Sequence, residues 1–436
     1  MSAHKYFRMQ KSFLIFLANI LLLLLIQGKS FCQGSWRTAT NAPKFNRIDD
    51  ISFTNDSTAF MGQDGKVYRS ADGGDNWTQI GSLPNNAYIR SIEFLDDSVG
   101  YIGTIYDAVG GVGLYSTTNG GVSWTRINNS VTGGMYGICG LDHKNQTIIG
   151  VGIYSEPGRF YISKDGGATW QSKQVPESAA LVDCLILDEK TFLIAGNSPD
   201  GRKAIILKST DSGDTWVEVA KSTYNMTYCW KLHIGENGLG LASIEDAPTS
   251  FISHDGGNTW QEITIDPSQE KQRFGGAYFI NEQLGWLGIQ WGVGTFETKD
   301  GGKNWNKINF GGAINKIRGT SHHRAIATGN TIYIYDVLSS THINPTDIPA
   351  QHRLSVSPNP AFSNIIIDAH VAVSTALRID IMDINGRLIH TVTHQSTKAG
   401  DYFWNYDIGK NPPGVYFVWM RTNEGHRVSR VVVNKS

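Results

Sequence analysis

The stretch Ser70-Ala-Asp72-Gly-Gly74-Asp-Asn-Trp77 recurs along the chain at nearly constant spacing. Each copy has a Ser or Thr, an Asp or Asn two residues later, and a Trp five residues after that. The acid or amide and the Trp of the six copies are Asp72 and Trp77, Asn119 and Trp124, Asp165 and Trp170, Asp211 and Trp216, Asp255 and Trp260, and Asp300 and Trp305. The steps of 47, 46, 46, 44 and 45 residues are typical of four-stranded propeller blades.

Each copy predicts a tight turn between two strands. The Asp or Asn side chain can accept hydrogen bonds from nearby backbone N–H groups, and the glycines allow backbone angles that other residues avoid. The motif is identified as an Asp-box, or BNR, repeat, and this resemblance implies a turn between the third and fourth strands of a blade. We interpret all six copies as structural, because residues about 45 positions apart on separate blades cannot converge on one ligand.

A second recurring segment predicts the first hairpin of each blade. Phe94–Gly103 and Phe279–Gly288 share the pattern of strand, polar turn and strand, and Phe53–Gly62 is a looser copy. Two hairpins in each period make four strands. After Trp305 three further strands are expected at 313–317, 324–328 and 331–335, whereas Ser35–Ala39 resembles an outer strand without its box.

The fold class is therefore predicted to be all-β, with a seven-bladed propeller over residues 33–338 and a small sandwich after it. The seventh blade would take its outer strand from the N-terminal segment, and this closure would remove a free sheet edge. The alternative is a six-bladed propeller with loose ends.

Residues 1–32 have the features of a signal peptide. Lys5, Arg8 and Lys11 precede the apolar run 13–26, which is shorter than the ~20 residues of a membrane span. Cleavage is expected after Cys32, and a lipoprotein modified at Cys32 is the alternative. Removal of four positive charges changes the net charge from −1 to −1 − 4 = −5. Without a basic run, nucleic acid is not an expected partner, and no membrane span is expected in the mature chain.

Three cysteines remain after this cleavage, at positions 139, 184 and 229, with the blade period of 45 residues between them. They occupy equivalent positions of three innermost strands, and we interpret Cys139, Cys184 and Cys229 as buried thiols. A disulfide and a shared metal site are the alternatives. The pair His322-His323 is interpreted as part of a loop, and no metal or other cofactor is expected.

A linker with two prolines is expected at 339–350, and residues 351–436 predict a second all-β unit of about six short strands. Ser357-Pro358-Asn359-Pro360, Asp383–Arg387, Gly414–Val418 and Arg430–Lys435 resemble the type A C-terminal sorting domain of the type IX secretion system. The resemblance implies export across the outer membrane, with the secretion machinery as partner, to the cell surface or the medium. An ordinary carbohydrate-binding sandwich is the alternative.

The propeller resembles the photosystem II stability/assembly factor-like group in having a box in nearly every blade and the hairpin of Phe94–Gly103. The resemblance implies a binding scaffold without catalysis and an arginine patch near the axis. Four arginines near the starts of predicted innermost strands are candidates for this patch: Arg47, Arg90, Arg273 and Arg318. They predict a positive rim for an acidic partner. The alternative is separate arginines compensated by Asp49, Asp50 and Glu93.

Two other functions are compatible with an Asp-box propeller. Sialidases and xyloglucanases also use Asp-box propellers, but the Phe/Tyr-Arg-Ile-Pro signature of sialidases is absent. Hydrolysis would need two carboxylates roughly 5–9.5 Å apart. Trp291 has no equivalent in the other blades and could stack on a sugar, whereas Trp286 occupies a core position. We therefore expect an exported, non-enzymatic propeller that recognises a protein or a glycan, with a glycoside hydrolase as the alternative.

Overall fold

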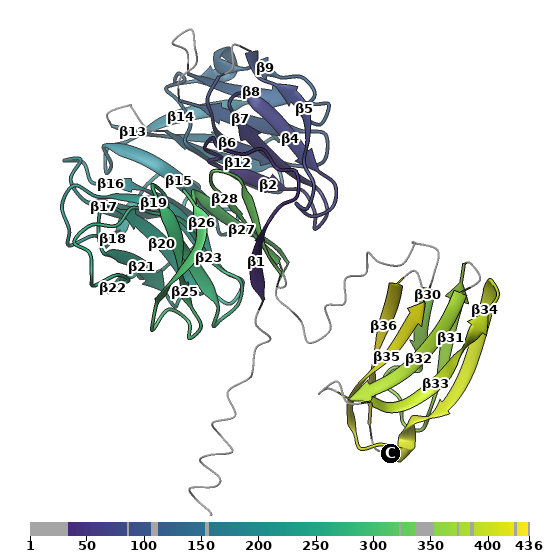
Figure 1. Ribbon diagram of the computed structural model, residues 1–436. Coiled ribbons are helices and arrows are strands. Elements are labelled where there is room, and N and C mark those ends of the chain that lie inside the picture. The colour runs from purple at the N-terminus through teal and green to yellow at the C-terminus, as the bar shows by residue number, and fades with distance from the viewer. Residues whose placement is uncertain are drawn as a thin grey trace, which may run out of the picture. The chain divides into compact units, whose positions relative to one another are not determined.

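The computed structural model describes residues 34–84, 87–105, 112–152, 157–321, 324–336, 353–372, 375–383, 388–422 and 425–434. The predicted signal peptide, the predicted linker and the His322-His323 pair lie outside these residues. The described part of the chain is built almost entirely of strands, with two short 3-10 helices at Asn128–Ser130 and Ile408–Lys410. It forms two compact units, of residues 34–336 and 353–434 (Figure 1).

The described part of the first unit contains seven sheets. The first three are β2 to β5 (Ile51–Phe53, Ala59–Gln63, Lys66–Ser70, Thr78–Ser82), β6 to β9 (Ile89–Phe94, Gly100–Thr104, Gly113–Thr117, Thr125–Arg126), and β11 to β14 (Gly140–Lys144, Thr147–Gly152, Gly158–Ser163, Trp170–Val175) with the short β10 (Val131–Thr132). The next three are β15 to β18 (Ala180–Ile186, Phe192–Asn197, Ala204–Ser209, Val217–Lys221), β19 to β22 (Tyr228–Ile234, Gly240–Glu245, Thr249–Ser253, Gln261–Thr264), and β23 to β26 (Phe274–Phe279, Gly285–Ile289, Val293–Thr298, Asn306–Gly312). The last is β27 to β29 (Lys316–Ser321, Arg324–Thr328, Ile332–Asp336) with β1 (Ser35–Thr38).

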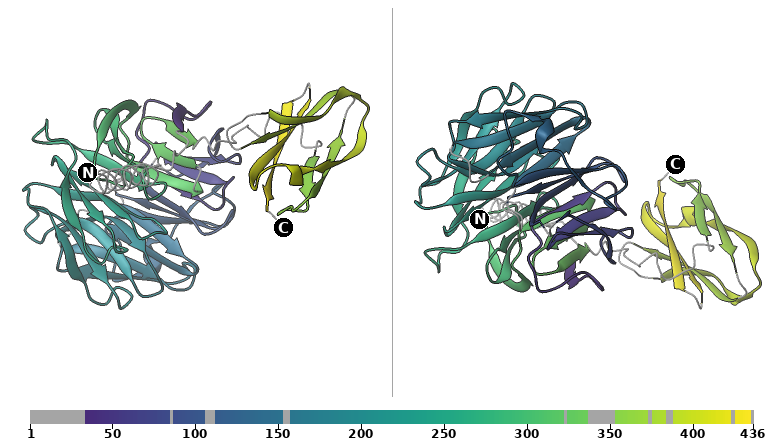
Figure 2. Two further views of the ribbon diagram at one scale, coloured as in Figure 1. Left: turned by 90° about the horizontal axis from the view of Figure 1, so that it is seen from below. Right: turned by 90° about the horizontal axis from the view of Figure 1, so that it is seen from above.

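Five of these sheets are antiparallel meanders in which each strand pairs with the next in sequence, and β11 to β14 form a sixth meander to which β10 adds in parallel beside β14. The first strands of neighbouring sheets contact one another in chain order, and β27 also contacts β2. The first strands lie toward the middle of the unit, whereas β5, β9, β18 and β22 lie outside (Figures 1 and 2). The buried side chains lie mostly between neighbouring sheets, as in the cluster of Phe60, Ile92, Phe94 and Trp124. This arrangement is propeller-like.

The N-terminal strand completes the last sheet. β1 runs antiparallel to β29, with Trp36 opposite Tyr335, so the predicted pairing of these segments is confirmed. The Trp36 ring stacks on Phe310 with centroids 4.5 Å apart and meets Trp286 edge-on at 5.1 Å. Trp286 is buried, as predicted for a core residue.

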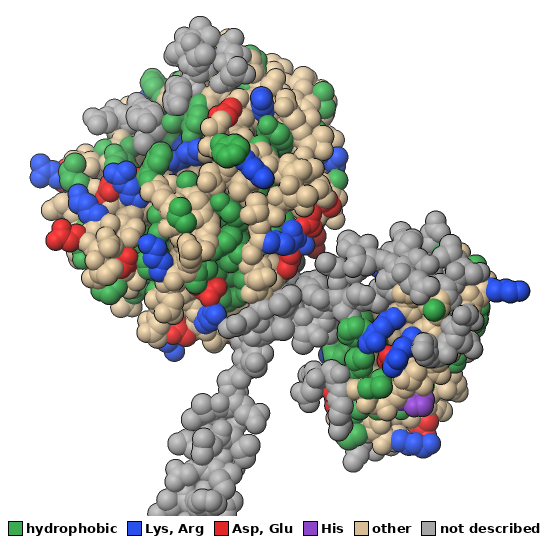
Figure 3. Space-filling model, viewed as in Figure 1, with side chains coloured by type: hydrophobic (Ala, Val, Ile, Leu, Met, Phe, Trp, Pro, Cys, Tyr) green, Lys and Arg blue, Asp and Glu red, His purple; other side chains and the backbone are tan. Residues whose placement is uncertain are grey.

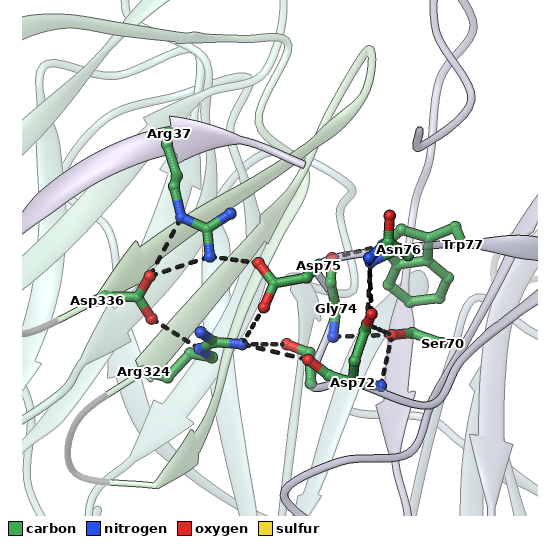
Figure 4. Close-up of polar contacts among 10 residues, drawn as sticks. Arg37, Ser70, Asp72, Gly74, Asp75, Asn76, Trp77, Arg324 and Asp336 are labelled. Atoms are coloured by element: carbon green, nitrogen blue, oxygen red, sulfur yellow. Dashed lines mark hydrogen bonds and ion pairs between the residues drawn. The ribbon is translucent and has the colours of Figure 1, made fainter. Parts of the chain in front are cut away.

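An ion network joins this last sheet to the first Asp-box turn (Figure 4). Arg37 and Arg324 each pair with both Asp75 and Asp336, so the four side chains form a closed cycle. Arg324 also donates to the Gly73 carbonyl at 3.0 Å. Because β1, β28 and the β4–β5 turn all contribute, the network connects the two ends of the first unit.

All six Asp-box turns share three internal hydrogen bonds, and four of them have a fourth bond from the indole. The Ser or Thr hydroxyl donates to the Asp or Asn Oδ1 at 2.7–2.9 Å. The second glycine N–H donates to that hydroxyl, and the N–H four residues after the Asp or Asn donates to Oδ1. The indole N–H of Trp77, Trp124, Trp170 and Trp305 donates to the same glycine's carbonyl. These bonds support the structural interpretation of the boxes.

The second unit has two sheets, β30-β31-β34 (Arg353–Ser357, Asn364–Val371, Gly400–Asp407) and β33-β32-β35-β36 (Leu388–Thr397, Thr375–Asp383, Gly414–Thr422, Gly425–Val433). A shared core with Ile365, Ile367, Ile379 and Val418 shows that the sheets pack face to face. The expected strand segments are present, but β34 was not predicted. Its inward residues Tyr402, Trp404 and Tyr406 alternate with polar or exposed ones, which is the signal that was missed.

Candidate ligand-binding face

One end of the innermost strands brings several of the predicted site residues together. Arg47 precedes β2, Arg90 is the second residue of β6, and Arg273 directly precedes β23. Asp49 pairs with both Arg47 and Arg90, the latter at 2.7 Å. Burial alone would raise the pKa of Asp49, but the two guanidinium groups outweigh it and hold that pKa below its usual value.

Aromatic rings cover these arginines. The Arg47 guanidinium lies 4.7 Å from the centre of the Trp291 ring, and the Arg90 guanidinium lies 5.0 Å from that of Trp230. The buried Gln290 amide links the two, because its oxygen can accept from Trp230 Nε1 at 3.1 Å and from Arg47 Nη2 at 2.9 Å. Trp291 lies in the β24–β25 turn with 58% of its surface exposed.

Two adjacent carboxylates complete this group, which we call the Trp291 cluster. Arg273 Nε donates to Asp246 Oδ1 at 2.9 Å, and Arg273 also forms a backbone bridge with Glu245. The Trp291 side chain lies close to Glu245. Burial, followed by the charge of Asp246, raises the pKa of the Glu245 carboxyl. The Trp291 cluster thus consists of Arg47, Asp49, Arg90, Trp230, Glu245, Asp246, Arg273, Gln290 and Trp291.

The structure places the fourth candidate arginine in a different group. Arg318 donates to Glu93 at 3.0 Å and lies 3.9 Å from Asp50, while His143 contacts the other Glu93 oxygen at 2.9 Å. Glu93 is three residues beyond Arg90 on β6, which corresponds to ~10 Å along a strand. Next to this group, burial and the Glu93 charge raise the pKa of Asp142 to about 6.

A further ionic centre, buried among the innermost strands, was not predicted. Asp183 is 1% exposed and lies 3.2 Å from Lys316 Nζ and 3.7 Å from Lys231 Nζ. Its Oδ2 also accepts from the Leu232 N–H, so it joins β15, β19 and β27. Burial lowers the pKa of Lys231 to about 8. Asp183 is a charged residue inside an otherwise apolar strand, and this pattern could have indicated a buried ion pair.

The arginines of the Trp291 cluster carry no excess of positive charge. Arg47, Arg90 and Arg273 are balanced by Asp49, Glu245 and Asp246, and each arginine is paired with a carboxylate. On the side of the first unit seen in Figure 3, basic and acidic side chains are interspersed. The geometry therefore offers an exposed aromatic ring with polar donors and acceptors around it.

Within the described ranges, no group of three or more His, Cys, Asp or Glu side chains could hold a metal ion. Cys139, Cys184 and Cys229 are buried, and none forms a disulfide with another described residue. The search for a helix long and apolar enough to cross a membrane found none in the described part of the chain.

Fold and site together define an all-β chain with a propeller-like unit and a separate sandwich. Residues 30–190 match the family model described as "Photosynthesis system II assembly factor YCF48", and residues 355–434 match the "Secretion system C-terminal sorting domain". The chain is 28% identical over 237 residues to the photosystem II assembly lipoprotein Ycf48 of Synechococcus sp. (strain CC9902). This match covers 52% of the chain and 63% of that protein, which is less than two thirds of its length.

Solved structures support the fold. A structure of YCF48 bound to D1 peptide has a TM-score of 0.52 at 16% identity and covers 71% of this chain and 98% of its own. A streptogramin B lyase has a TM-score of 0.55 at 10% identity, covering 71% and 100%. The GH74 xyloglucanase of Xanthomonas campestris has a TM-score of 0.52 at 11% identity, covering 91% and 75%. The chain therefore carries a Ycf48-like propeller domain and a C-terminal sorting domain.

Proposed function

We propose that the seven sheets of the first unit are the blades of one closed propeller, which spans residues 33–338. The contact of β27 with β2 and the pairing of β1 with β29 support this ring. Residues 1–32 are proposed as a cleaved signal peptide, 339–350 as a linker and 351–436 as the sorting domain. In such a ring the starts of the innermost strands lie around one end of the axis, where the Trp291 cluster would face the solvent.

The proposed function is that of an exported, non-enzymatic binding scaffold that recognises a protein or a glycan at the cell surface or in the medium. The observation that carries it is the exposed Trp291 ring, held by Arg47 beside Glu245, in a chain whose C-terminal segment matches a sorting domain. Arg47, Arg273 and Trp291 would contact the ligand, whereas Arg90 and Arg318 would position other side chains. The YCF48 structure that holds a D1 peptide supports a peptide or protein as one class of ligand.

Export is tested by removing residues 351–436 in a bacterium with a type IX secretion system. The truncated protein should accumulate in the periplasm, whereas the full chain should reach the surface or medium; immunoblots of the fractions measure both. A full chain with Phe403→Ser, an exposed position of β34, is a control for general effects on the sandwich. Equal export of the truncated and full chains would contradict the proposed role of the domain.

The absence of catalysis is tested separately. Glu245, with its raised pKa, and the adjacent Asp246 are the carboxylates most similar to an acid–base pair near the exposed ring. The full chain should release no reducing sugar from xyloglucan, β-glucan or sialylated glycans. Sugar release that is lost in Glu245→Gln would instead establish a glycoside hydrolase.

A further inference from the structure

We propose that the ligand of the Trp291 cluster is an uncharged glycan, with one pyranose ring stacked on the free face of Trp291. This inference rests on the proposed recognition function and names its ligand. It follows from three features of the cluster: the fixed orientation of the indole, the balance of its charges, and the exposed apolar residues close to it in sequence.

The first feature is a preorganised stacking surface. Arg47 occupies one face of the Trp291 ring at 4.7 Å, and Glu245 lies close to the same side chain. Arg47 is itself held by Asp49, so its position does not depend on a ligand. With 58% of Trp291 exposed, the face opposite Arg47 is available to a flat partner. A ring held in place before binding loses little conformational entropy when the ligand arrives.

The second feature is the charge balance. Arg47 and Arg90 share Asp49, and Arg273 is paired with Asp246. An anionic ligand would have to displace one of these carboxylates, and it would then approach Glu245 as well. A neutral sugar avoids this repulsion, because its hydroxyl groups can donate to Glu245 or Asp246 and accept from Arg273. The cluster therefore favours a ligand that both donates and accepts without net charge.

The third feature is a pair of exposed apolar side chains close in sequence to residues of the cluster. Val293 is two residues from Trp291 and Phe45 is two residues from Arg47, and they are 66% and 91% exposed. The C–H face of a pyranose is apolar while its edge carries hydroxyl groups. An aromatic platform with polar groups at its rim matches both parts of such a ligand.

The test is affinity electrophoresis of the full chain in gels that contain a single polysaccharide. The neutral probes are xyloglucan, galactomannan and mixed-linkage β-glucan, and the anionic probes are polygalacturonate and alginate. At least one neutral probe should retard the protein more than either anionic probe does. Trp291→Ala should weaken this retention about tenfold or more, because loss of a central aromatic contact removes much of the binding energy. Val217→Thr, at a similarly exposed position of β18 outside the Trp291 cluster, is the matched control and should keep the affinity.

Circular dichroism and thermal unfolding of each variant establish that the fold is intact before binding is compared. Three results would overturn the inference: no retardation by a neutral probe, stronger retardation by the anionic probes, or unchanged retention of Trp291→Ala. If cross-linking on intact cells then captures a protein whose yield falls in Trp291→Ala, the recognition function stands with a protein ligand. If neither assay depends on Trp291, the proposed function fails as well.

Discussion

A single Asp or Asn side chain closes each Asp-box turn, and Asp165 illustrates how. Its Oδ1 accepts from the Thr169 N–H at 2.9 Å and from the Ser163 hydroxyl at 2.8 Å, while Oδ2 accepts from the Thr169 hydroxyl. These bonds lower the pKa of Asp165 to about 2, and the bonds from Thr169 have the largest effect. In the second box the amide of Asn119 closes the turn in the same way. Its Oδ1 accepts from the Ser123 N–H, and its Nδ2 donates to Ser123 Oγ at 2.9 Å.

At this scale we predict that Asp165→Ala lowers the free energy of unfolding by about 1 kcal/mol at pH 7, through the lost hydrogen bonds. Asp165→Asn should lose less, since Asn119 shows that an amide closes the same turn. Because the folded pKa of Asp165 is lowered, its stabilisation is complete above about pH 4 and fades as the pH falls toward 2. Urea unfolding at pH 7 and pH 3 measures the difference. An equal loss for both variants would contradict this account.

At the scale of the strand, the inner elements are joined by buried charges as well as by apolar contacts. The Asp183 carboxylate on β15 forms ion pairs with Lys316 on β27 and Lys231 on β19. Burial alone would raise the pKa of Asp183, but the two ammonium groups outweigh it and lower that pKa. Lys231 is more deeply buried than Lys316, and its ammonium group lies farther from the Asp183 carboxylate. Burial therefore lowers the pKa of Lys231 despite the attraction of Asp183.

At the strand scale we predict that removing the Asp183 charge and removing the Lys231 charge have unequal effects on the free energy of unfolding. Asp183→Asn should destabilise the protein by roughly 3–5 kcal/mol, because two buried ammonium groups lose their counter-charge. Lys231→Met should be neutral or stabilising at pH 7, since Lys316 still pairs with Asp183. The folded pKa of Lys231 is lowered, so its penalty is full below pH 8 and fades as the pH rises toward 10.5.

Guanidinium unfolding of both variants at pH 7 and pH 10 measures this asymmetry. The advantage of Lys231→Met over the parent chain should shrink at pH 10. A loss in Lys231→Met as large as in Asp183→Asn would show that both lysines are needed to compensate Asp183.

At the scale of the whole first unit, its two chain ends meet in the network of Arg37, Asp75, Arg324 and Asp336 (Figure 4). The four side chains are 23–41% exposed, so salt screens their attraction partly. Each arginine contacts both aspartates, so this network should stabilise the fold more than an isolated surface ion pair does.

We predict that Arg324→Ala destabilises the unit by about 1 kcal/mol at low salt and speeds hydrogen exchange in β1. The loss should shrink in 1 M NaCl. Lys173→Ala breaks a pair with Asp214 that does not involve β1, and it should leave exchange in β1 unchanged. Hydrogen exchange with mass spectrometry and thermal unfolding measure both variants. Unaltered exchange in β1 after Arg324→Ala would show that strand pairing alone holds the N-terminal segment.

The sequence by itself determined the Asp-box turns, the hairpins between them and the pairing of β1 with β29. These depend on contacts within a few residues and on a repeat that places equivalent segments in equivalent environments. The short inward pattern of Tyr402, Trp404 and Tyr406 was overlooked because alternation in a single edge strand is a weaker signal than a repeat.

Only the tertiary structure decided which charges and rings meet. Arg47 and Trp291 were both candidates, but their stacking joins residues of the first and sixth sheets, and nothing near either residue encodes it. The same holds for Asp183 and Lys316, which are 133 residues apart, and for Arg318, which lies with Glu93 rather than with Arg47. Electrostatic compensation depends on distance in space, so three of the four candidate arginines share one cluster, the fourth lies in another group, and each is paired with a carboxylate.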